Sequence, residues 1–267
     1  MRIVSWNLHG ATIPGRATNA MQHRAWEHMR DRLGADLVLA QEVSKGGVPP
    51  WLAEEGWTVL AGIFGTHRKA WYWGSVIAAR PGLRLVARPE LFSDRWLAHL
   101  YDLVLLGQVQ LGDVTLLVSS VHSAAMPVRK WLEQSRPALP LTEEEMAGLQ
   151  RPGSQEEPYI NDFAFTALER TFRGGRFIAS GDWNTCRKYP GGPEFFARAR
   201  ERGWVECHPE PEEQSYFSRG GANEYQLDHA FCDATTARSL GSCRVVVDEV
   251  TRQVSDHAPL LIDFPGL

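Results

Sequence analysis

The stretch LVLLGQVQLGDVTLLVSSVHS, residues 103–123, does most to decide the fold. It contains two apolar runs of strand type, Leu103–Gln110 and Val114–Val121, joined by the short step Leu-Gly-Asp at 111–113. A connection this short that contains glycine indicates a β-hairpin, and therefore antiparallel pairing of its two strands. A mixed sheet accommodates this hairpin better than a purely parallel, doubly wound sheet.

Further short apolar runs on both sides of the hairpin also predict strands. They are Ile3–Trp6, Leu37–Ala40, Ser75–Ala79, Leu83–Ala87, Phe177–Ser180, His229–Cys232, Arg244–Val247 and Pro259–Phe264. Helical patterns fall between several of these runs, over residues 21–33, 161–172 and 193–202. The alternation predicts an α/β layer protein, because the apolar faces of the helices need a sheet to cover them.

The composition, with 43% hydrophobic and 22% charged residues in 267, is typical of a globular chain that buries a sizeable core. We find no internal repeat and no convincing linker. We therefore expect one catalytic domain over residues 1–267, with an irregular surface excursion at about 127–158 that has room for one short helix. The acidic run at 143–145 within that excursion is most simply a solvated face.

The net charge of −4 argues against a broadly basic surface that neutralises many phosphates at once. The four cysteines are widely spaced without a CxxC pair, which favours reduced thiols over a zinc site or a disulfide framework. No apolar signal region precedes the first strand, and no apolar run approaches 18 residues. We therefore expect a cytoplasmic protein with no membrane span, and no obligate protein partner is evident.

Polar residues able to take part in metal and phosphate chemistry recur at the ends of the predicted strands. They are Asn7, Glu42, His122, Asp182, Asn184, Asp228, Asp256 and His257. Each alone has a structural explanation as a turn or capping residue. Loops at strand ends converge on a site in layered α/β folds, however, so the set as a whole indicates a shared cleft.

Six segments that contain these residues resemble the endonuclease/exonuclease/phosphatase superfamily. They are Ser-Trp-Asn-Leu (5–8), Ala-Asp-Leu-Val-Leu-Ala-Gln-Glu-Val (35–43), Ser-Val-His-Ser (120–123), Ser-Gly-Asp-Trp-Asn (180–184), Gln-Leu-Asp-His-Ala-Phe (226–231) and Ser-Asp-His-Ala-Pro (255–259). The resemblance spans essentially the whole chain, and the ordered combination is far more specific than any one segment. It implies a four-layer α/β sandwich, in which two mixed β-sheets pack face to face and are flanked by helices.

The resemblance also implies a divalent-metal phosphoesterase site at one edge of the sandwich. Glu42 would be the main Mg²⁺ ligand, assisted by Asn7 and Asp256, with Mn²⁺ as the alternative metal. This donor set agrees with the chemistry of Mg²⁺, which prefers oxygen ligands and keeps several waters beside one or two carboxylates.

The remaining members of the set would act on the phosphate and on the attacking water. By resemblance, Asp182 and Asn184 would hold both, and His257 would be the catalytic histidine oriented by Asp228. A phosphodiester is anionic, so the charge that develops on its oxygens has to be neutralised. The sequence leaves open whether Asp182 or His257 takes the proton of the water.

His122 bears on the branch of the superfamily. The matching position is usually Tyr in the abasic-site and exonuclease III type branch, and His in the pancreatic-deoxyribonuclease, sphingomyelinase and inositol-phosphatase branches. Ser-Val-His-Ser is therefore more similar to the second group. No counterpart is evident for the second His-supporting Glu of the pancreatic deoxyribonuclease pattern, which argues against a secreted, disulfide-bonded nuclease.

Two loops are candidates for substrate contact. The loop at 65–73 interleaves basic residues with aromatics, and Arg68 and Trp71 in it could contact phosphates and stack on bases. Arg219, in the loop at 218–223, is a candidate phosphate contact. An aromatic cluster under a basic rim and a plain hairpin tip are the structural alternatives, and neither loop identifies a substrate.

The sequence thus favours a Mg²⁺-dependent phosphoesterase, more specifically a phosphodiesterase or nuclease, with nucleic acid as the first substrate class. A small phosphorylated or lipid-headgroup ester is the second. The rival hypothesis from another class is a catalytically silent binding module of the same fold. No member of the polar set is replaced, which speaks against that module.

Overall fold

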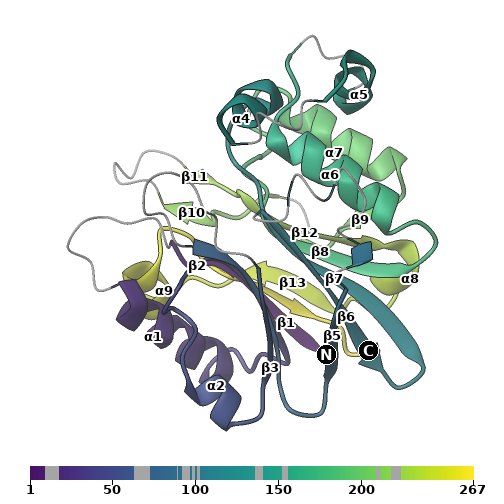
Figure 1. Ribbon diagram of the computed structural model, residues 1–267. Helices are drawn as coiled ribbons and strands as arrows, with labels where there is room; N and C mark the ends of the chain where they lie inside the picture. The colour runs from purple at the N-terminus through teal and green to yellow at the C-terminus, as the bar shows by residue number, and fades with distance from the viewer. Residues whose placement is uncertain are drawn as a thin grey trace.

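The protein is described by a computed structural model over residues 1–9, 18–62, 73–88, 90–91, 97, 100, 103–135, 141–151, 156–208, 211–217 and 224–267. Within these ranges two six-stranded sheets pack against each other (Figure 1). The first sheet has the order β13-β14-β1-β2-β4-β3, and the second the order β5-β6-β7-β8-β12-β9. A separate two-stranded sheet is formed by β10 and β11.

The strands of the first sheet are β1 (Arg2–Asn7), β2 (Leu37–Ser44), β3 (Thr58–Ala61), β4 (Trp73–Ala79), β13 (Ser242–Val245) and β14 (Leu260–Asp263). Those of the second are β5 (Arg84–Ala87), β6 (Val104–Leu111), β7 (Val114–His122), β8 (Arg176–Asp182), β9 (Trp204–Glu206) and β12 (Asp228–Asp233). The small sheet comprises β10 (Tyr216–Phe217) and β11 (Glu224–Tyr225). Because β1–β2 and β7–β8 pair in parallel and their neighbours pair antiparallel, both large sheets are mixed.

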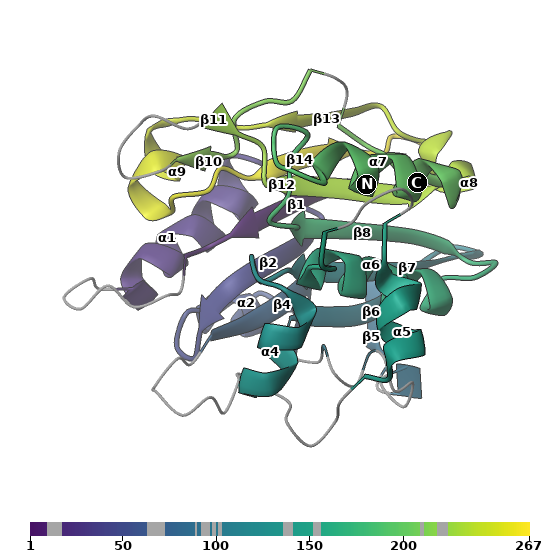
Figure 2. The same ribbon diagram turned by 90° about the horizontal axis from the view of Figure 1, so that it is seen from above.

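The helices lie on the outer faces of the two sheets (Figures 1 and 2). They are α1 (Thr18–Asp31), α2 (Trp51–Glu54), α4 (Val128–Ser135), α5 (Glu143–Leu149), α6 (Ile160–Thr171), α7 (Gly192–Glu201), α8 (Ala234–Ala237) and α9 (Glu249–Val254). Figure 1 shows α1, α2 and α9 on the side of the first sheet and α4 to α7 on the side of the second. The predicted four-layer α/β sandwich is thereby confirmed.

The core follows from the two-residue period of the strands, which sends alternate side chains to opposite faces of a sheet. On β1, Ile3 joins the apolar layer between the sheets, whereas Val4 packs in the outer layer with Trp26 and Met29 of α1. The second sheet has a similar outer layer, which includes Phe163 of α6. Three apolar layers therefore separate the four layers of secondary structure.

The hairpin at the centre of the second sheet forms as predicted. Leu111 and Val114 lie opposite each other at the ends of β6 and β7, so the turn has only two residues between them. Gly112 has a φ of 56°, a left-handed conformation that glycine adopts without a steric penalty.

The surface excursion is more regular than its prolines indicated. It contains α4 and α5, and the acidic run is the first turn of α5. Thr142 caps α5, and Glu145 completes a capping box with it, so these carboxylates stabilise the positive end of a helix besides being solvated. The edge strand β3, which has only four residues, was also missed, although Val59, Leu60 and Ala61 form a short apolar run.

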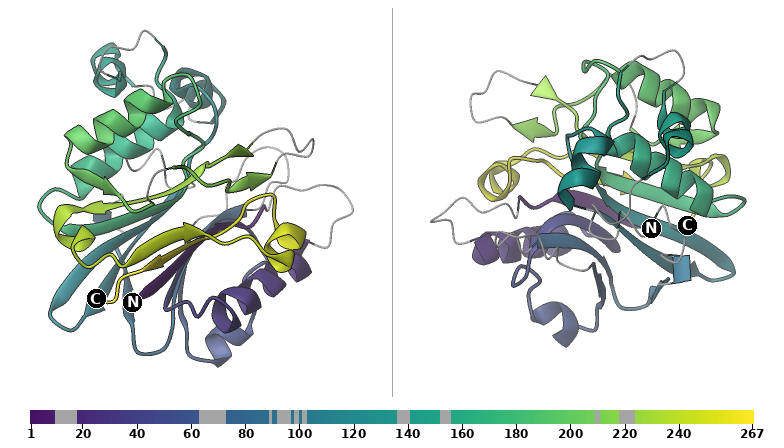
Figure 3. Two further views of the ribbon diagram at one scale, coloured as in Figure 1. Left: turned by 180° about the vertical axis from the view of Figure 1, so that it is seen from behind. Right: turned by 45° about the horizontal axis from the view of Figure 1, so that its top comes forward.

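The two ends of the described chain lie next to each other, one just before β1 and the other just after β14. The amino group of Met1 donates hydrogen bonds to the carbonyl oxygens of Phe264, at 2.7 Å, and Leu267, at 2.8 Å, and the termini lie side by side (Figure 3). No helix within the described ranges is long and apolar enough to cross a membrane. All four cysteines are buried free thiols.

Candidate functional site

Three of the predicted site residues lie side by side on neighbouring strands of the second sheet. His122 ends β7, Asp182 ends β8 and Asp228 begins β12. In the register of the sheet, Asp182 is opposite His122 on one side and Asp228 on the other. The strand ends thus bring together residues that are far apart in the sequence.

The first sheet contributes Asn7 and Glu42 to the same edge. Asn7 is the last residue of β1, and Glu42 lies in a bulge of β2 between Ala40 and Val43. The amide nitrogen of Asn7 donates to Glu42 Oε1 at 3.2 Å and to Asp182 Oδ2 at 3.1 Å. The second of these hydrogen bonds joins the two sheets at the site.

Backbone strain is concentrated at this edge. Among the described residues, the non-glycine residues with positive φ are His9 (46°), Glu42 (51°) and Asn184 (47°). Such conformations are unfavourable for residues with a Cβ, and they persist where the surrounding structure imposes them. Their concentration at the site is an independent indication that this edge is functional.

The segment Ser-Gly-Asp-Trp-Asn depends on its glycine. A Cβ on Gly181 would lie 1.9 Å from the carbonyl oxygen of Val121, so only glycine allows β8 to approach β7 this closely. Trp183 is fully buried and anchors the loop in the outer core. Asn184 returns to the site, where its backbone N–H donates to Asp182 Oδ1 at 2.9 Å and its amide to Asp182 Oδ2 at 3.0 Å.

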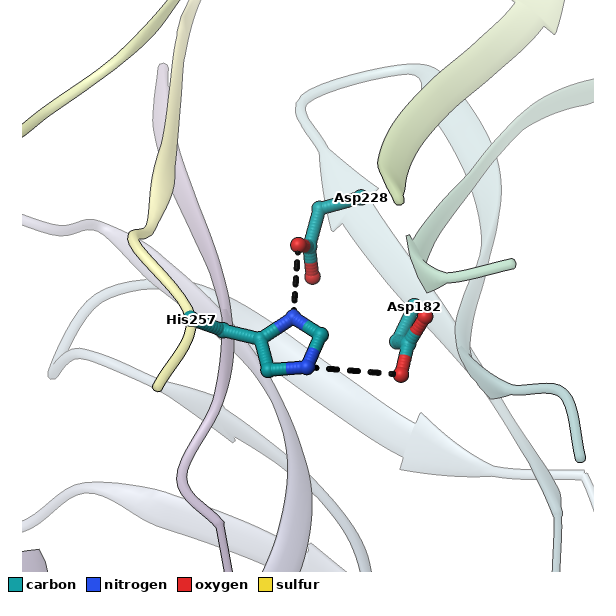
Figure 4. A group of neighbouring side chains, drawn as sticks. All are labelled: Asp182, Asp228 and His257. Carbon is teal, nitrogen blue, oxygen red and sulfur yellow. Dashed lines mark hydrogen bonds and ion pairs between the residues drawn. The ribbon is translucent and has the colours of Figure 1, made fainter. Parts of the chain in front are cut away.

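His257 lies between two carboxylates that come from different strands (Figure 4). Its Nδ1 is 2.8 Å from Asp228 Oδ2, and its Nε2 is 3.8 Å from Asp182 Oδ2. The first distance is that of a charge-assisted hydrogen bond, and the second is longer than a hydrogen bond. Nε2 is therefore directed into the site and remains available for another acceptor.

The surroundings of His257 fix its position. The indole N–H of Trp6 donates to the carbonyl oxygen of His257 at 2.8 Å. The hydroxyl of Ser255 accepts from the N–H of His257 and donates to the carbonyl oxygen of Asn7. On the other side, the hydroxyl of Ser215 donates to Asp228 Oδ2 at 2.7 Å.

The electrostatics of the site separate the pKa values of Asp182 and His257. Burial raises the pKa of Asp182 to about 6, and the charge of Asp228 adds to this rise. Burial alone would lower the pKa of His257, but the charges of Asp228 and Asp182 raise it to about 10. At neutral pH the pair therefore contains an ionised carboxylate with a pKa near the working range and a protonated imidazole.

Glu42 and His122 form a second buried pair. Glu42 Oε1 is 3.2 Å from His122 Nε2. Burial would raise the pKa of Glu42, but the hydrogen bond and the charge of His122 lower it to about 2. Burial likewise opposes the charge of His122, and Glu42 raises the pKa of His122 above its ordinary value.

Asp256 joins the site through His9, which the sequence analysis did not single out. His9 Nδ1 is 2.8 Å from Asp256 Oδ1, and the N–H of His9 donates to Asn7 Oδ1 at 3.0 Å. The hydrogen bond to Asp256 raises the pKa of His9, and the charges of Asp256 and Glu42 act in the same direction. His9 therefore lies within the combined field of these two carboxylates.

The donor set fits a hard divalent cation. Carboxylates of Glu42 and Asp256 and the amide oxygen of Asn7 are the ligand types that Mg²⁺ prefers. The same negative charges raise the pKa of His9 and His122, so the cluster favours positive charge. These three residues are thus chemically suited to hold the metal that the resemblance implied.

A second grouping, Asp182, Asp228 and His257, also has one possible ligand atom from each residue within 4.8 Å of the others. It includes an imidazole, however, and its shortest contact is a hydrogen bond of 2.8 Å between His257 and Asp228. Because Mg²⁺ prefers oxygen ligands, this grouping is better suited to proton transfer and phosphate contact than to holding that metal.

The structure therefore brings together seven predicted residues through direct contacts, and the eighth, Asp256, through His9. The supporting residues Ser215 and His9 were missed. Ser215 lies in an irregular segment, whereas His9 follows Asn7 by two positions and was open to detection. The predicted substrate contacts Arg68, Trp71 and Arg219 lie outside the described residues.

Solved structures with the same architecture are found for proteins of low sequence identity. The endonuclease domain of TRAS1, a telomere-specific non-LTR retrotransposon, superposes with a TM-score of 0.61 at 15% identity, covering 99% of this chain and 98% of that one. A 3'-5' exonuclease from Neisseria meningitidis gives a TM-score of 0.59 at 18% identity, with 99% of both chains covered. An endonuclease/exonuclease/phosphatase family protein from Leptotrichia buccalis gives 0.59 at 13% identity, again with 99% of both chains covered.

At these identities the likeness establishes a shared fold, which is also that of the endonuclease/exonuclease/phosphatase family protein from Leptotrichia buccalis. No protein-family model matches the sequence, and no curated protein matches it at a significant level. An AP endonuclease from Archaeoglobus fulgidus shares the fold at a TM-score of 0.60 and 15% identity. The likeness therefore does not distinguish the branches that His122 was expected to separate.

Proposed function

We propose that the protein is a divalent-metal-dependent phosphoesterase that hydrolyses phosphodiester bonds, with nucleic acid as the first substrate class. The observation that carries the proposal is the contact network at the sheet edge, in which Asp228 orients His257 and the free Nε2 of His257 faces Asp182. The solved structures of the same fold support it, since they include nucleases such as the retrotransposon endonuclease domain and the Neisseria exonuclease.

We assign Asp182 as the group that accepts the proton of the attacking water. A carboxylate with a pKa of about 6 is largely ionised at neutral pH and is a stronger base than an ordinary aspartate. Asn184 donates two hydrogen bonds to it and fixes its orientation. His257, which is protonated below its pKa of about 10, is then the donor that neutralises charge on a phosphoryl oxygen.

Glu42, with Asn7 and Asp256, would hold the metal, and His122 beside Glu42 would contribute a further donor to the phosphate. When bound, Mg²⁺ or Mn²⁺ supplies Lewis-acid neutralisation of phosphoryl charge. The strained backbone of Glu42 holds its carboxylate at the edge of β2, where it faces the residues of the second sheet.

A panel assay with Mg²⁺, Mn²⁺ or EDTA tests the proposal. Its substrates are single-stranded and double-stranded DNA, RNA, an abasic duplex, inositol phosphates, sphingomyelin and the generic diester bis(4-nitrophenyl) phosphate. We expect metal-dependent hydrolysis that EDTA abolishes. Glu42→Ala, Asp182→Ala and His257→Ala should each remove activity while circular dichroism shows a folded chain.

Two outcomes would contradict the proposal. Retained activity in a folded His257→Ala variant would remove the assigned mechanism. Absence of metal-dependent turnover on every phosphoester would instead favour the catalytically silent binding module. Preference for sphingomyelin or inositol phosphates would keep the chemistry and replace the substrate class, in line with the branch that His122 favours.

A further inference from the structure

A row of tyrosines extends away from His257 along the rim of the site. The ring of Tyr216 lies 5.1 Å from that of His257, centroid to centroid, and Tyr216 pairs with Tyr225 across the β10–β11 sheet. The ring of Tyr225 lies 4.8 Å from that of Tyr189. All three tyrosines are half-buried, so each combines a fixed position with an accessible part of its side chain.

Tyr189, at the far end of the row, lines a hollow of about 580 Å³. Asn184, which orients the carboxylate of Asp182, lines the same hollow, so the hollow opens directly beside the proposed catalytic centre. Tyr159, Pro127 and Pro190 contribute further planar or apolar surface. A volume of this order is ample for one planar heterocycle between aromatic walls.

Two unused hydrogen-bond donors line the hollow. Asn161 is 3% exposed, and its amide nitrogen makes no hydrogen bond with any described residue. Arg151 is 6% exposed, and within the described chain its Nη1 likewise makes no hydrogen bond, while its Nε is held by Asp162 at 2.8 Å. Neither nitrogen is fully buried, so both are accessible from the hollow and can donate to a ligand with acceptor atoms.

The charge of the hollow excludes a phosphate as that ligand. Glu156 and Glu157 both line it and are exposed, whereas the charge of Arg151 is balanced by Asp162, so the two glutamates would repel an anion. An uncharged planar group with acceptor atoms on its edge can stack on the aromatic walls, accept from the two donors and avoid repulsion by the glutamates. A nucleobase is such a group.

We propose that the hollow and the tyrosine row bind the unpaired bases that flank the scissile phosphodiester, so that the substrate is single-stranded nucleic acid. This inference rests on the proposed function and specifies its substrate class. Tyr189 provides a stacking surface for a base in the hollow, and Tyr225 and Tyr216 provide one toward His257. Bases paired in a duplex are stacked on each other and do not enter such a hollow.

The donors also specify which bases fit. Asn161 Oδ1 already accepts from Arg151 Nη2, at 3.3 Å, and from the N–H of Asp162, at 2.9 Å. Asn161 therefore offers only its amide N–H groups, and the paired donor–acceptor recognition of adenine by asparagine is not possible here. Guanine, thymine and uracil present carbonyl oxygens to such donors, and we expect them to bind more tightly than adenine.

Binding measured in EDTA tests the inference without turnover. The probes are short fluorescein-labelled strands of equal length: oligothymidylate, the same length of abasic backbone, and the corresponding duplex. We expect the base-bearing strand to bind at least about fivefold more tightly than the abasic strand, since stacking on an aromatic side chain favours each base by that order or more. Equal binding of the abasic and base-bearing strands, or tighter binding of the duplex, would overturn the proposal.

The variants Tyr189→Ala and Tyr189→Phe localise the effect. Tyr189→Ala should reduce the preference for base-bearing over abasic strands at least about fivefold, whereas Tyr189→Phe keeps the stacking surface and should keep the preference. Trp51→Ala is a matched control, because Trp51 is a half-exposed aromatic residue on α2 in the outer layer of the first sheet. A loss in Trp51→Ala as large as that in Tyr189→Ala would contradict the assignment.

Abasic strands that carry one base beside the central phosphate test the base preference in the wild-type protein. Guanine or thymine should bind more tightly than adenine, and Asn161→Asp, which keeps the accepting oxygen and removes one of the two donors, should reduce the difference. Equal binding of all three bases to the wild type would contradict the proposed role of the two donors. Hydrolysis of bis(4-nitrophenyl) phosphate is measured separately, so failure of the base site and failure of the phosphoesterase proposal are distinguishable.

Discussion

Two buried histidines in this protein have nearly the same surroundings and different chemical capacities. His257 Nδ1 is 2.8 Å from Asp228, and His229 Nδ1 is 3.0 Å from Glu206. Each imidazole is at least nine-tenths buried, and the neighbouring carboxylates raise the pKa of each against the effect of burial. Asp228 and His229 are moreover consecutive on β12, so one strand contributes to both pairs.

The difference lies at the second ring nitrogen. His229 Nε2 is 3.0 Å from the carbonyl oxygens of both Thr185 and Gln226, so this nitrogen is fully used. His257 Nε2 has only the distant carboxylate of Asp182, at 3.8 Å. Burial and a carboxylate partner therefore do not mark a catalytic histidine by themselves. The feature that we take to mark a catalytic histidine is a second ring nitrogen, such as Nε2 of His257, that is directed into an open site.

The largest effect that this comparison predicts is the loss of activity in His257→Ala. If His257 donates to the phosphoryl group, its removal should lower kcat by about 10²–10⁴-fold. Stability should also fall, because the substitution removes the buried hydrogen bond between Nδ1 and Asp228, although Ser215 still donates to that carboxylate. Steady-state hydrolysis of bis(4-nitrophenyl) phosphate and thermal unfolding of the same preparations provide both measurements.

His229→Ala should lower stability as well but leave most of the activity of the folded protein. Glu206, which is 15% exposed, would lose one of its buried partners and retain Arg187, and the carbonyl oxygens of Thr185 and Gln226 would lose a donor. We expect a loss of about 3 kcal/mol in the free energy of unfolding, at the lower end of the range for a broken buried ion pair. Urea denaturation measures it, and the folded fraction at low temperature should retain most of the activity. Loss of activity without loss of stability would show that the two histidines do not differ as described.

The sequence was sufficient for the elements whose signal is local. The apolar runs of β6 and β7 and the glycine between them predict the hairpin without reference to the rest of the chain. Asn7, Asp182 and Asp228 could then be predicted as site residues from the ends of strands. A strand, and a polar residue directly before or after it, can both be recognised in the sequence alone.

What the sequence could not supply depends on contacts between distant segments. Ser215 reaches Asp228 from an irregular segment with no pattern that distinguishes it from other serines. The row from Tyr189 to Tyr216 exists only because the loop after β8 lies against the β10–β11 sheet. The local sequence alone likewise does not separate His229 from His257, because each follows an aspartate, and only the family resemblance selected His257.

The pH dependence of hydrolysis tests whether Asp182, the carboxylate that faces His257, is the proton acceptor. Because burial raises the pKa of Asp182 to about 6, the ionised carboxylate disappears as the pH falls through that value. We expect kcat to fall about tenfold for each unit below pH 6, and to stay level above it while His257 keeps its proton up to about 10. The acidic limb should persist in Tyr189→Phe, a control outside the proton-transfer pair. A flat profile between pH 5 and pH 7 would remove Asp182 as the proton acceptor.

His9 is an intermediate case between the two buried histidines, and its substitution should have the smallest effect. Its Nδ1 is 2.8 Å from Asp256, but its side chain is 19% exposed, so it orients a proposed metal ligand from the rim. Asn tolerates the left-handed conformation of this position, with φ of 46°, which makes His9→Asn a better test than alanine. We expect the half-saturating Mg²⁺ concentration to rise on the order of tenfold, as for other groups that orient a metal ligand, with kcat at saturating metal nearly unchanged. Calorimetric titration with Mg²⁺ measures the same shift without turnover, and an unchanged affinity would place His9 with His229, as a histidine that contributes to the fold alone.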